Sequence, residues 1–145
     1  MKKHLAAAAV IIAMIAAGAA FTKASGKKED KMAGTDKLVV VWTSGDRDVA
    51  LKMVFMYTLN AKKHGWWDQV RLVVWGPSSK LASEDEEIQT ELIKMKEAGV
   101  ELMACKACAD MYGVSEDLEK LGIEVTYMGQ PLTEMLKSGW TSMTF

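Results

Sequence analysis

The two cysteines of the chain, Cys105 and Cys108, are separated by two residues in the segment MACKACAD. Thiols at this spacing occur in dithiol–disulfide exchange, in half of a metal site and in sulfur carriers. The same spacing fits two small apolar residues at the start of a helix, because free cysteine is among the most buried residue types. The elements that flank the pair therefore decide which chemistry is expected.

Cys105 directly follows a buried strand predicted over residues 100–104, and a short helix is predicted over residues 106–112. Unpaired N–H groups and partial positive charge at the start of a helix favour a thiolate over a thiol. Lys106 adds a positive charge next to this position. Cys108 lies one turn further on, near enough to attack a persulfide or disulfide on Cys105. We therefore predict Cys105 as the nucleophile and Cys108 as its partner.

Two other interpretations of the pair are weaker. A zinc site uses about four ligands, and beyond the first 24 residues the chain offers only the two cysteines and His64, for which a surface position is expected. No metal or cofactor is therefore predicted, although a site shared between subunits stays open. A thioredoxin fold would place the pair after its first strand and beside a cis-proline. Here the pair follows the third strand, and the prolines are Pro77 and Pro131.

The body of the chain alternates apolar, β-branched runs with segments of helical periodicity. Strands are predicted over residues 38–42, 70–75, 100–104, 123–128 and 140–145, and helices between residues 46 and 64, 83 and 99, 105 and 113, 115 and 122, and 130 and 139. Such alternation implies a mainly parallel sheet covered on both faces. The expected fold is a three-layer α/β/α sandwich with five strands and doubly wound, flavodoxin-like winding.

Several element boundaries follow from local signals. Residues 76–79, GPSS, predict a break after the second strand, and Ser83 with Glu86 fits a capping box for the next helix. Ser115 is predicted to cap a later helix. Five methionines fall at predicted core positions, where they are expected as apolar filler rather than copper ligands: Met53, Met56, Met95, Met103 and Met111.

Loops beyond the carboxyl ends of the strands are the expected ligand sites of such a sheet. Ser44 and Gly45 follow the first strand, Gly76 follows the second, and the turn at Cys105 follows the third. We predict Ser44, Gly45, Gly76 and Lys106 as binding residues. A helix-capping turn is the competing interpretation of Ser44 and Gly45, because the chain has neither a dinucleotide-binding nor a P-loop pattern.

The N-terminus has the pattern of an export signal. Lys2 and Lys3 precede a run without charge over residues 5–20, and small residues follow at positions that suit cleavage. We predict a signal peptide over residues 1–24, removed on export to the periplasm or another exported location. An uncleaved signal that anchors the chain to a membrane is the alternative.

The remaining chain is predicted to comprise a polar linker over residues 25–36 and one domain over residues 37–145. The first 25 residues hold three of the 18 basic residues and none of the 19 acidic ones, so the body is mildly acidic. Without a basic stripe to neutralise phosphates, binding to nucleic acid is not expected.

From about Lys37 to Phe145 the chain resembles the DsrE family, in its DsrE/DsrF/TusD-like and YchN-like members. The resemblance rests on the segments LVVVWTSGD, VRLVVWGPS, AGVELMACKACADMYGV, LGIEVTYMG and GWTSMTF. It implies a small α/β domain that is commonly a trimer or a hexamer. In sulfur-relay members a cysteine after the third strand accepts a persulfide and passes it on, and Cys105 matches that cysteine. Cys108 matches the second cysteine of YchN-like members.

Two departures separate the chain from the sulfur-relay members. Those members act in the cytoplasm, whereas export is predicted here, and they tend to have an arginine where this chain has Tyr112. The departures argue against transfer-RNA thiolation.

The first expectation is a homo-oligomer that handles sulfane sulfur or exchanges disulfides through Cys105 and Cys108, with a donor or acceptor protein or a small thiol as its partner. The alternative is a non-catalytic oligomer that binds a small ligand or serves assembly, with the cysteines as packing residues.

Overall fold

The computed structural model describes residues 36–145. The predicted signal peptide at residues 1–24 lies outside the described residues, as does the predicted linker except for Asp36. Among the described helices, none has the length and apolar character that crossing a bilayer requires.

The described residues form a five-stranded sheet in which every neighbouring pair is parallel, with the order β4-β3-β2-β1-β5. The strands are β1 (Lys37–Trp42), β2 (Gln69–Val74), β3 (Glu101–Cys105), β4 (Glu124–Thr126) and β5 (Thr141–Thr144). The apolar runs that predicted buried strands are the central members of this sheet, as expected where both faces are covered. The predicted five-stranded α/β fold is confirmed.

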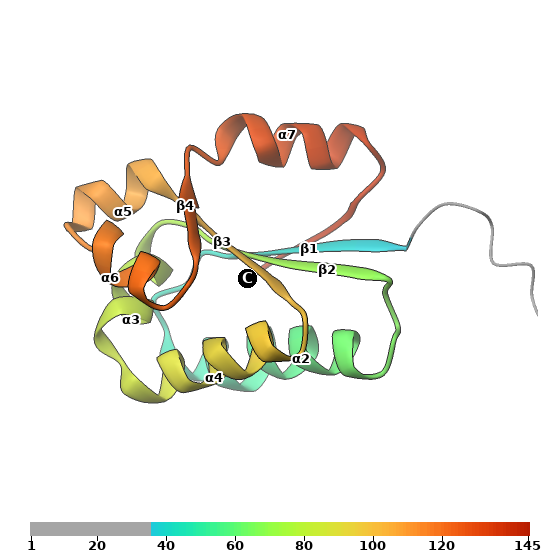
Figure 1. The fold of residues 1–145 in the computed structure, drawn as a ribbon, viewed down its shortest axis with the longest axis horizontal. Coiled ribbons are helices and arrows are strands. Elements are labelled where there is room, and N and C mark those ends of the chain that lie inside the picture. The colour runs from blue at the N-terminus through green and yellow to red at the C-terminus, as the bar shows by residue number, and fades with distance from the viewer. Residues whose placement is uncertain (1–35) are drawn as a thin grey trace, which may run out of the picture. The chain divides into compact units, whose positions relative to one another are not determined.

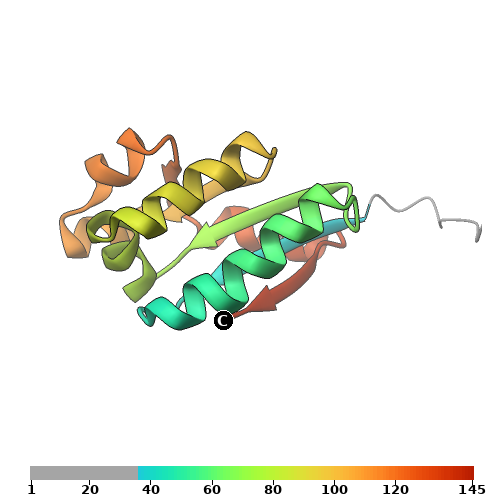
Figure 2. The same ribbon diagram turned by 90° about the horizontal axis from the view of Figure 1, so that it is seen from below.

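Helices cover the sheet on both faces, with α2 and α4 on one face and α7 on the other (Figure 1). The helical segments are α1 (Arg47–Val49), the π-helical η1 (Ala50–Phe55), α2 (Met56–Lys63), α3 (Pro77–Glu84), α4 (Glu86–Glu97), α5 (Lys106–Tyr112), α6 (Ser115–Lys120) and α7 (Gly129–Lys137). Figure 2 shows α2 and α4 side by side on their face. The order of the strands explains why the helices lie on two faces. The connections from β1 to β4 advance in one direction along the sheet, whereas the connection from β4 to β5 returns across it, so right-handed crossovers place its helix α7 on the opposite face.

The alternation of side chains along each strand divides the core in two. Leu38, Val40 and Trp42 of β1 pack with the residues of α2 and α4, and Trp42 meets Phe55 edge-on with ring centroids 5.0 Å apart. The intervening β1 residues join a second cluster beneath α7. Its buried members are Val39, Val41, Val73, Met103, Cys105, Met128, Met135 and Trp140. Cys105 thus belongs to the α7 face.

Strand β2 ends before residues 76–79, as predicted, but Pro77 then begins α3, a helix that the sequence did not predict. Proline suits the first helical position, where its missing N–H costs no hydrogen bond. The predicted cap at Ser83 is wrong, because Ser83 lies inside α3 and its hydroxyl donates to the Lys80 carbonyl. Asp85 is the N-cap of α4, and its carboxylate accepts from the N–H groups of the second and third residues of that helix.

The predicted cap at Ser115 is also wrong. Ser115 is the first residue of α6, and Val114 occupies the cap position without a side-chain bond. The Ser115 hydroxyl donates instead to the Asp110 carboxylate at 2.6 Å. The serine therefore ties α6 to α5, because a neighbouring acid is available to it.

Three of the five methionines predicted in the core are exposed, namely Met53, Met56 and Met111, whereas Met95 and Met103 are buried as predicted. Met53 belongs to the π-helical η1 and Met56 follows it. A π-helix has hydrogen bonds between residues i and i+5. The α-helical period of 3.6 residues therefore does not predict which side chains of this segment are buried, and both methionines lie on the exposed side. Met111 lies on the outer side of α5.

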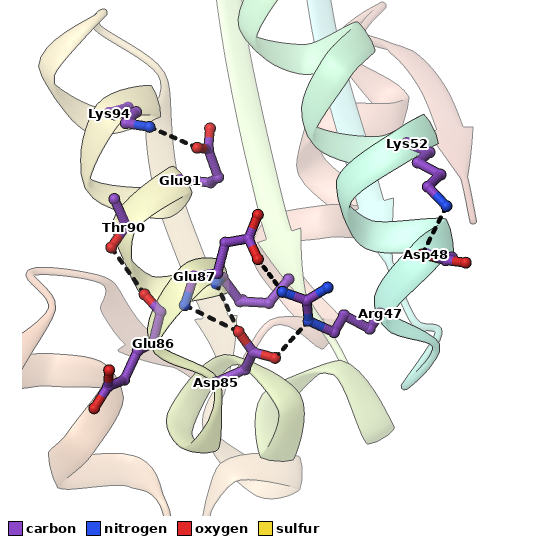
Figure 3. A network of polar contacts seen from close by, with 10 residues as sticks. Arg47, Asp48, Lys52, Asp85, Glu86, Glu87, Thr90, Glu91 and Lys94 are labelled. Carbon is purple, nitrogen blue, oxygen red and sulfur yellow. Dashed lines mark hydrogen bonds and ion pairs between the residues drawn. The ribbon is translucent and has the colours of Figure 1, made fainter.

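Arg47 connects the first helical turn to the start of α4 (Figure 3). Its Nε lies 2.8 Å from Oδ2 of Asp85, and its guanidinium also forms an ion pair with Glu87. Asp85 in addition accepts from the backbone N–H of Ile88. Two hydrogen bonds lower the pKa of the Asp85 carboxyl: the bond from the N–H of Ile88 has the larger effect, and the bond from the Arg47 guanidinium has the smaller one.

Replacing Asp85 with asparagine should destabilise the domain at neutral pH and not in acid. Asparagine still caps a helix, but it lacks the charge that Arg47 binds. The pKa of Asp85 is lower in the folded than in the unfolded chain. The ionised carboxylate therefore stabilises the folded chain above the unfolded pKa, and this stabilisation is lost as the pH falls through the folded pKa. We expect Asp85→Asn to lower the Tm by a few degrees at neutral pH.

The measurement is thermal unfolding at neutral pH and at a pH below the range in which native carboxyls titrate. Glu86→Gln removes a neighbouring charge that Arg47 does not bind, and it serves as the control. A Tm difference between Asp85→Asn and the wild type that persists unchanged in acid would contradict this assignment.

Candidate functional site

The two thiols lie at the junction of β3 and α5. Cys105 is the last residue of β3 and the N-cap of α5, and Cys108 lies in the first turn of that helix. Both are free cysteines, with Cys105 5% exposed and Cys108 half-buried. The strand therefore ends where the sequence predicts, and it delivers the Cys105 side chain to the α7 face.

The thiols interact with each other and with the loop after β2. Burial raises the pKa of the Cys108 thiol, and its hydrogen bond with the Cys105 sulfur raises it further. The backbone N–H of Gly76, which donates to the Cys108 sulfur, lowers that pKa in part. Gly76 has φ +73° and ψ −134°, a backbone conformation that is close to exclusive to glycine. The raised pKa keeps Cys108 mainly protonated at neutral pH, as a hydrogen-bond donor beside Cys105.

Cys105 lines a cavity of about 600 Å³ although little of its surface is exposed. Cys105 and Ala107 line it from the junction of β3 and α5, and Trp75 lines it from just after β2. The other lining residues run from the end of β4 into α7, namely Thr126, Tyr127, Met128, Gly129, Gln130, Pro131 and Glu134. Cys105 therefore borders a space large enough for a small organic molecule.

The strand order explains why the cavity forms here. After β3 the chain continues outward through α5 and α6 to β4, and after β4 it turns back over the opposite face as α7. Adjacent loops that leave a sheet in opposite directions open a crevice at the carboxyl ends of the strands. The loop after β4 was not among the predicted site loops. Gly129 and Pro131, which follow a predicted strand, are the residues that indicate a turn here.

The other predicted binding residues do not gather around this cavity. Gly45 lines a separate cavity of about 300 Å³ with Pro77 and Tyr112 among its walls. Ser44 accepts a hydrogen bond from the N–H of Asp46, and Asp46 caps α1. Ser44 and Gly45 thus form the capping turn that was the competing interpretation.

The two remaining predicted binding residues, Lys106 and Gly76, lie near the cysteines, unlike Ser44 and Gly45. The Lys106 ammonium lies 2.9 Å from an Asp110 carboxylate oxygen, and this hydrogen bond raises the pKa of the lysine. The charge of Lys106 is therefore matched on its own helix. Gly76 is the one predicted binding residue that contacts the cysteine pair, through its N–H.

Within residues 36–145 no three potential ligands from His, Cys, Asp and Glu cluster to hold a metal ion. His64 is exposed at the end of α2, where its ring stacks on Trp66 with centroids 5.4 Å apart. It lies on the surface, as predicted.

Residues 36–145 match the DsrE/DsrF-like family. The chain belongs to this family. The match covers the same part of the chain as the resemblance found in the sequence. No curated protein matches the chain.

Solved structures of DsrE/DsrF-like fold agree with this assignment. A conserved protein of unknown function, BT1422 from Bacteroides thetaiotaomicron, is 40% identical over 79% of this chain and 98% of its own, with a TM-score of 0.75. The ychN protein from E. coli is 20% identical over 76% of this chain and 99% of its own, with a TM-score of 0.63. A protein of unknown function, MTH1491 from Methanobacterium thermoautotrophicum, is 19% identical over 76% of this chain and 100% of its own, with a TM-score of 0.61. The last two comparisons concern the fold alone.

Proposed function

We propose that this DsrE/DsrF-like protein carries sulfane sulfur on Cys105 and passes it on with the help of Cys108. The observation that carries the proposal is the position of Cys105, which occupies the N-cap position of α5, lines the 600 Å³ cavity and interacts with a second thiol. A packing cysteine needs neither a cavity nor a thiol neighbour. The predicted export signal lies outside the described residues, and export stays a prediction.

Loading is a thiol exchange that needs no external oxidant. The Cys105 thiolate attacks the outer sulfur of an organic persulfide, R–S–SH. A new S–S bond forms to Cys105 while the S–S bond of the donor breaks, and RS⁻ leaves with the electron pair. The products are Cys105–S–SH and a thiolate.

Cys108 then provides two routes onward. Its raised pKa keeps it protonated while Cys105 is loaded, so it does not compete for the donor. Once deprotonated, its thiolate can attack the outer sulfur of the persulfide, which transfers the sulfur to Cys108 and frees the Cys105 thiolate. Attack on the inner sulfur instead gives the Cys105–Cys108 disulfide and releases HS⁻.

The test is mass spectrometry of the purified protein after treatment with a neutral organic persulfide. We expect a gain of about 32 Da, one sulfur atom, on the peptide that contains Cys105. The Cys105→Ser variant should show no gain at this position. An unmodified wild-type protein whose thiols also resist alkylation would refute the proposal.

That negative result would favour the alternative of a non-catalytic assembly protein. One observation supports it, namely an exposed groove of about 280 Å³ along η1 and α2 whose walls include Met53, Met56 and Trp66. Exposed apolar side chains that line one groove are typical of contact between proteins. The predicted homo-oligomer would use such a surface under either function.

A further inference from the structure

The cavity beside Cys105 carries one charged side chain among the described residues that line it. That side chain is Glu134 of α7, and neither lysine nor arginine contributes to the walls. Oε1 of Glu134 accepts a hydrogen bond of 2.8 Å from Nε2 of Gln130, another lining residue. Trp75, Met128 and Pro131 supply apolar surface. The space that the thiol faces is therefore apolar with a negative charge on one side.

Neither Lys106 nor Lys137 lines the cavity. Lys106 precedes the lining residue Ala107, but its ammonium pairs with the Asp110 carboxylate at 2.9 Å. Lys137 lies one turn beyond Glu134 on α7 and is not a lining residue. An anion that entered the cavity would thus approach a carboxylate without a cation on the walls to bind it, which is unfavourable at short range.

We propose that this cavity selects small organic sulfur donors with a neutral or cationic substituent and discriminates against anionic donors such as thiosulfate, with Glu134 as a specificity-determining residue. The inference rests on the proposed function for the identity of the reaction. Size supports an organic donor, because a cavity of about 600 Å³ lies within the range of sites for small molecules and far exceeds an inorganic ion.

The test uses three methanethiosulfonates that differ in charge: the cationic trimethylammonioethyl, the neutral methyl and the anionic sulfonatoethyl reagent. Each reacts in the same way, as the Cys105 thiolate bonds to the R–S sulfur and methanesulfinate leaves with the electron pair. The Cys108→Ser variant is the background, so that a single thiol reacts. The measured quantity is the ratio of cationic to anionic rate constants on Cys105, divided by the same ratio for a small free thiol in solution.

We expect this normalised ratio to be roughly three- to tenfold at low ionic strength and to fall as salt screens Glu134. Glu134→Gln should bring it close to one. Glu97→Gln makes the same change of net charge on α4, which covers the opposite face of the sheet, and it should leave the ratio unchanged.

Three results would overturn the inference: a normalised ratio of one or less, an equal response to Glu134→Gln and Glu97→Gln, or no reaction of Cys105 with any of the three reagents. A failure of the charge selectivity and a failure of the proposed sulfur transfer give different results. Charge selection without sulfur loading from an organic persulfide would refute sulfur transfer alone. Loading that is equally fast from thiosulfate and from a neutral persulfide would refute the selectivity alone.

Discussion

The Cys108→Ser variant should load sulfur on Cys105 and then keep it. In the wild-type protein the two sulfurs share a hydrogen bond, so the nucleophile that removes sulfur from Cys105 is already in place. An intramolecular thiol one helical turn away has a large kinetic advantage over thiols in solution. Its removal should lengthen the lifetime of the Cys105 adduct roughly tenfold or more. Serine retains the size and hydrogen bonding of the side chain but cannot form an S–S bond.

The measurement follows the adduct by mass spectrometry and the released sulfide after the donor is removed. Met111→Ser is a matched control, since it changes an exposed side chain on the same helix and leaves both thiols in place. Loss of the adduct at equal rates in Cys108→Ser and in the wild type would show that Cys108 takes no part in the transfer.

Leu92→Ala should be the more damaging of two substitutions at adjacent positions of α4. Leu92 is 0% exposed in the core between α4 and the sheet, whereas its neighbour Ile93 is 42% exposed. Truncating a buried leucine removes apolar contacts and leaves a cavity, at a cost of about 2–5 kcal/mol. Ile93→Ala should cost less than about 1 kcal/mol, because its side chain already contacts solvent.

Urea unfolding of both variants at neutral pH measures these free energies. A loss of about 2–5 kcal/mol is a large fraction of the stability of an ordinary domain, so Leu92→Ala should also lower the yield of folded protein. Similar losses for the two variants would mean that α4 presents a different face to the sheet.

The sequence predicted the sheet well, because β1, β2 and β3 are largely buried and consist mostly of apolar residues. It predicted α3 poorly. Gly76 and Pro77 together suggest a loop. In the structure they begin α3, because Gly76 has the positive φ at its N-cap and Pro77 is its first residue. The same two residue types signal either a loop or a tight entry into a helix, and only the packing of α3 distinguishes them.

For the site, the sequence placed Cys105 at the end of β3 but could not identify its neighbours. Local periodicity locates strands along the chain, whereas the loops that meet depend on the lateral order of the strands. In the sheet β4 lies next to β3, so the loop after β4 and the start of α7 line the same cavity as Cys105. Strand β1 is two positions away, and its loop with Gly45 accordingly lines another cavity.

The last strand sets the order in which this cavity can be completed. Strands β2, β3 and β4 each pair with the strand that precedes them in the sequence, but β5 returns to β1, and the hydrogen bond from Thr43 to Phe145 joins residues 102 positions apart. This closure has the highest contact order in the sheet and carries the largest loop-closure entropy. Because α7 belongs to the same returning segment, a nascent chain that has formed its first four strands still lacks one wall over the thiols. The protection of Cys105 therefore depends on the segment from α7 to β5 and is acquired only after that segment has folded back onto the sheet.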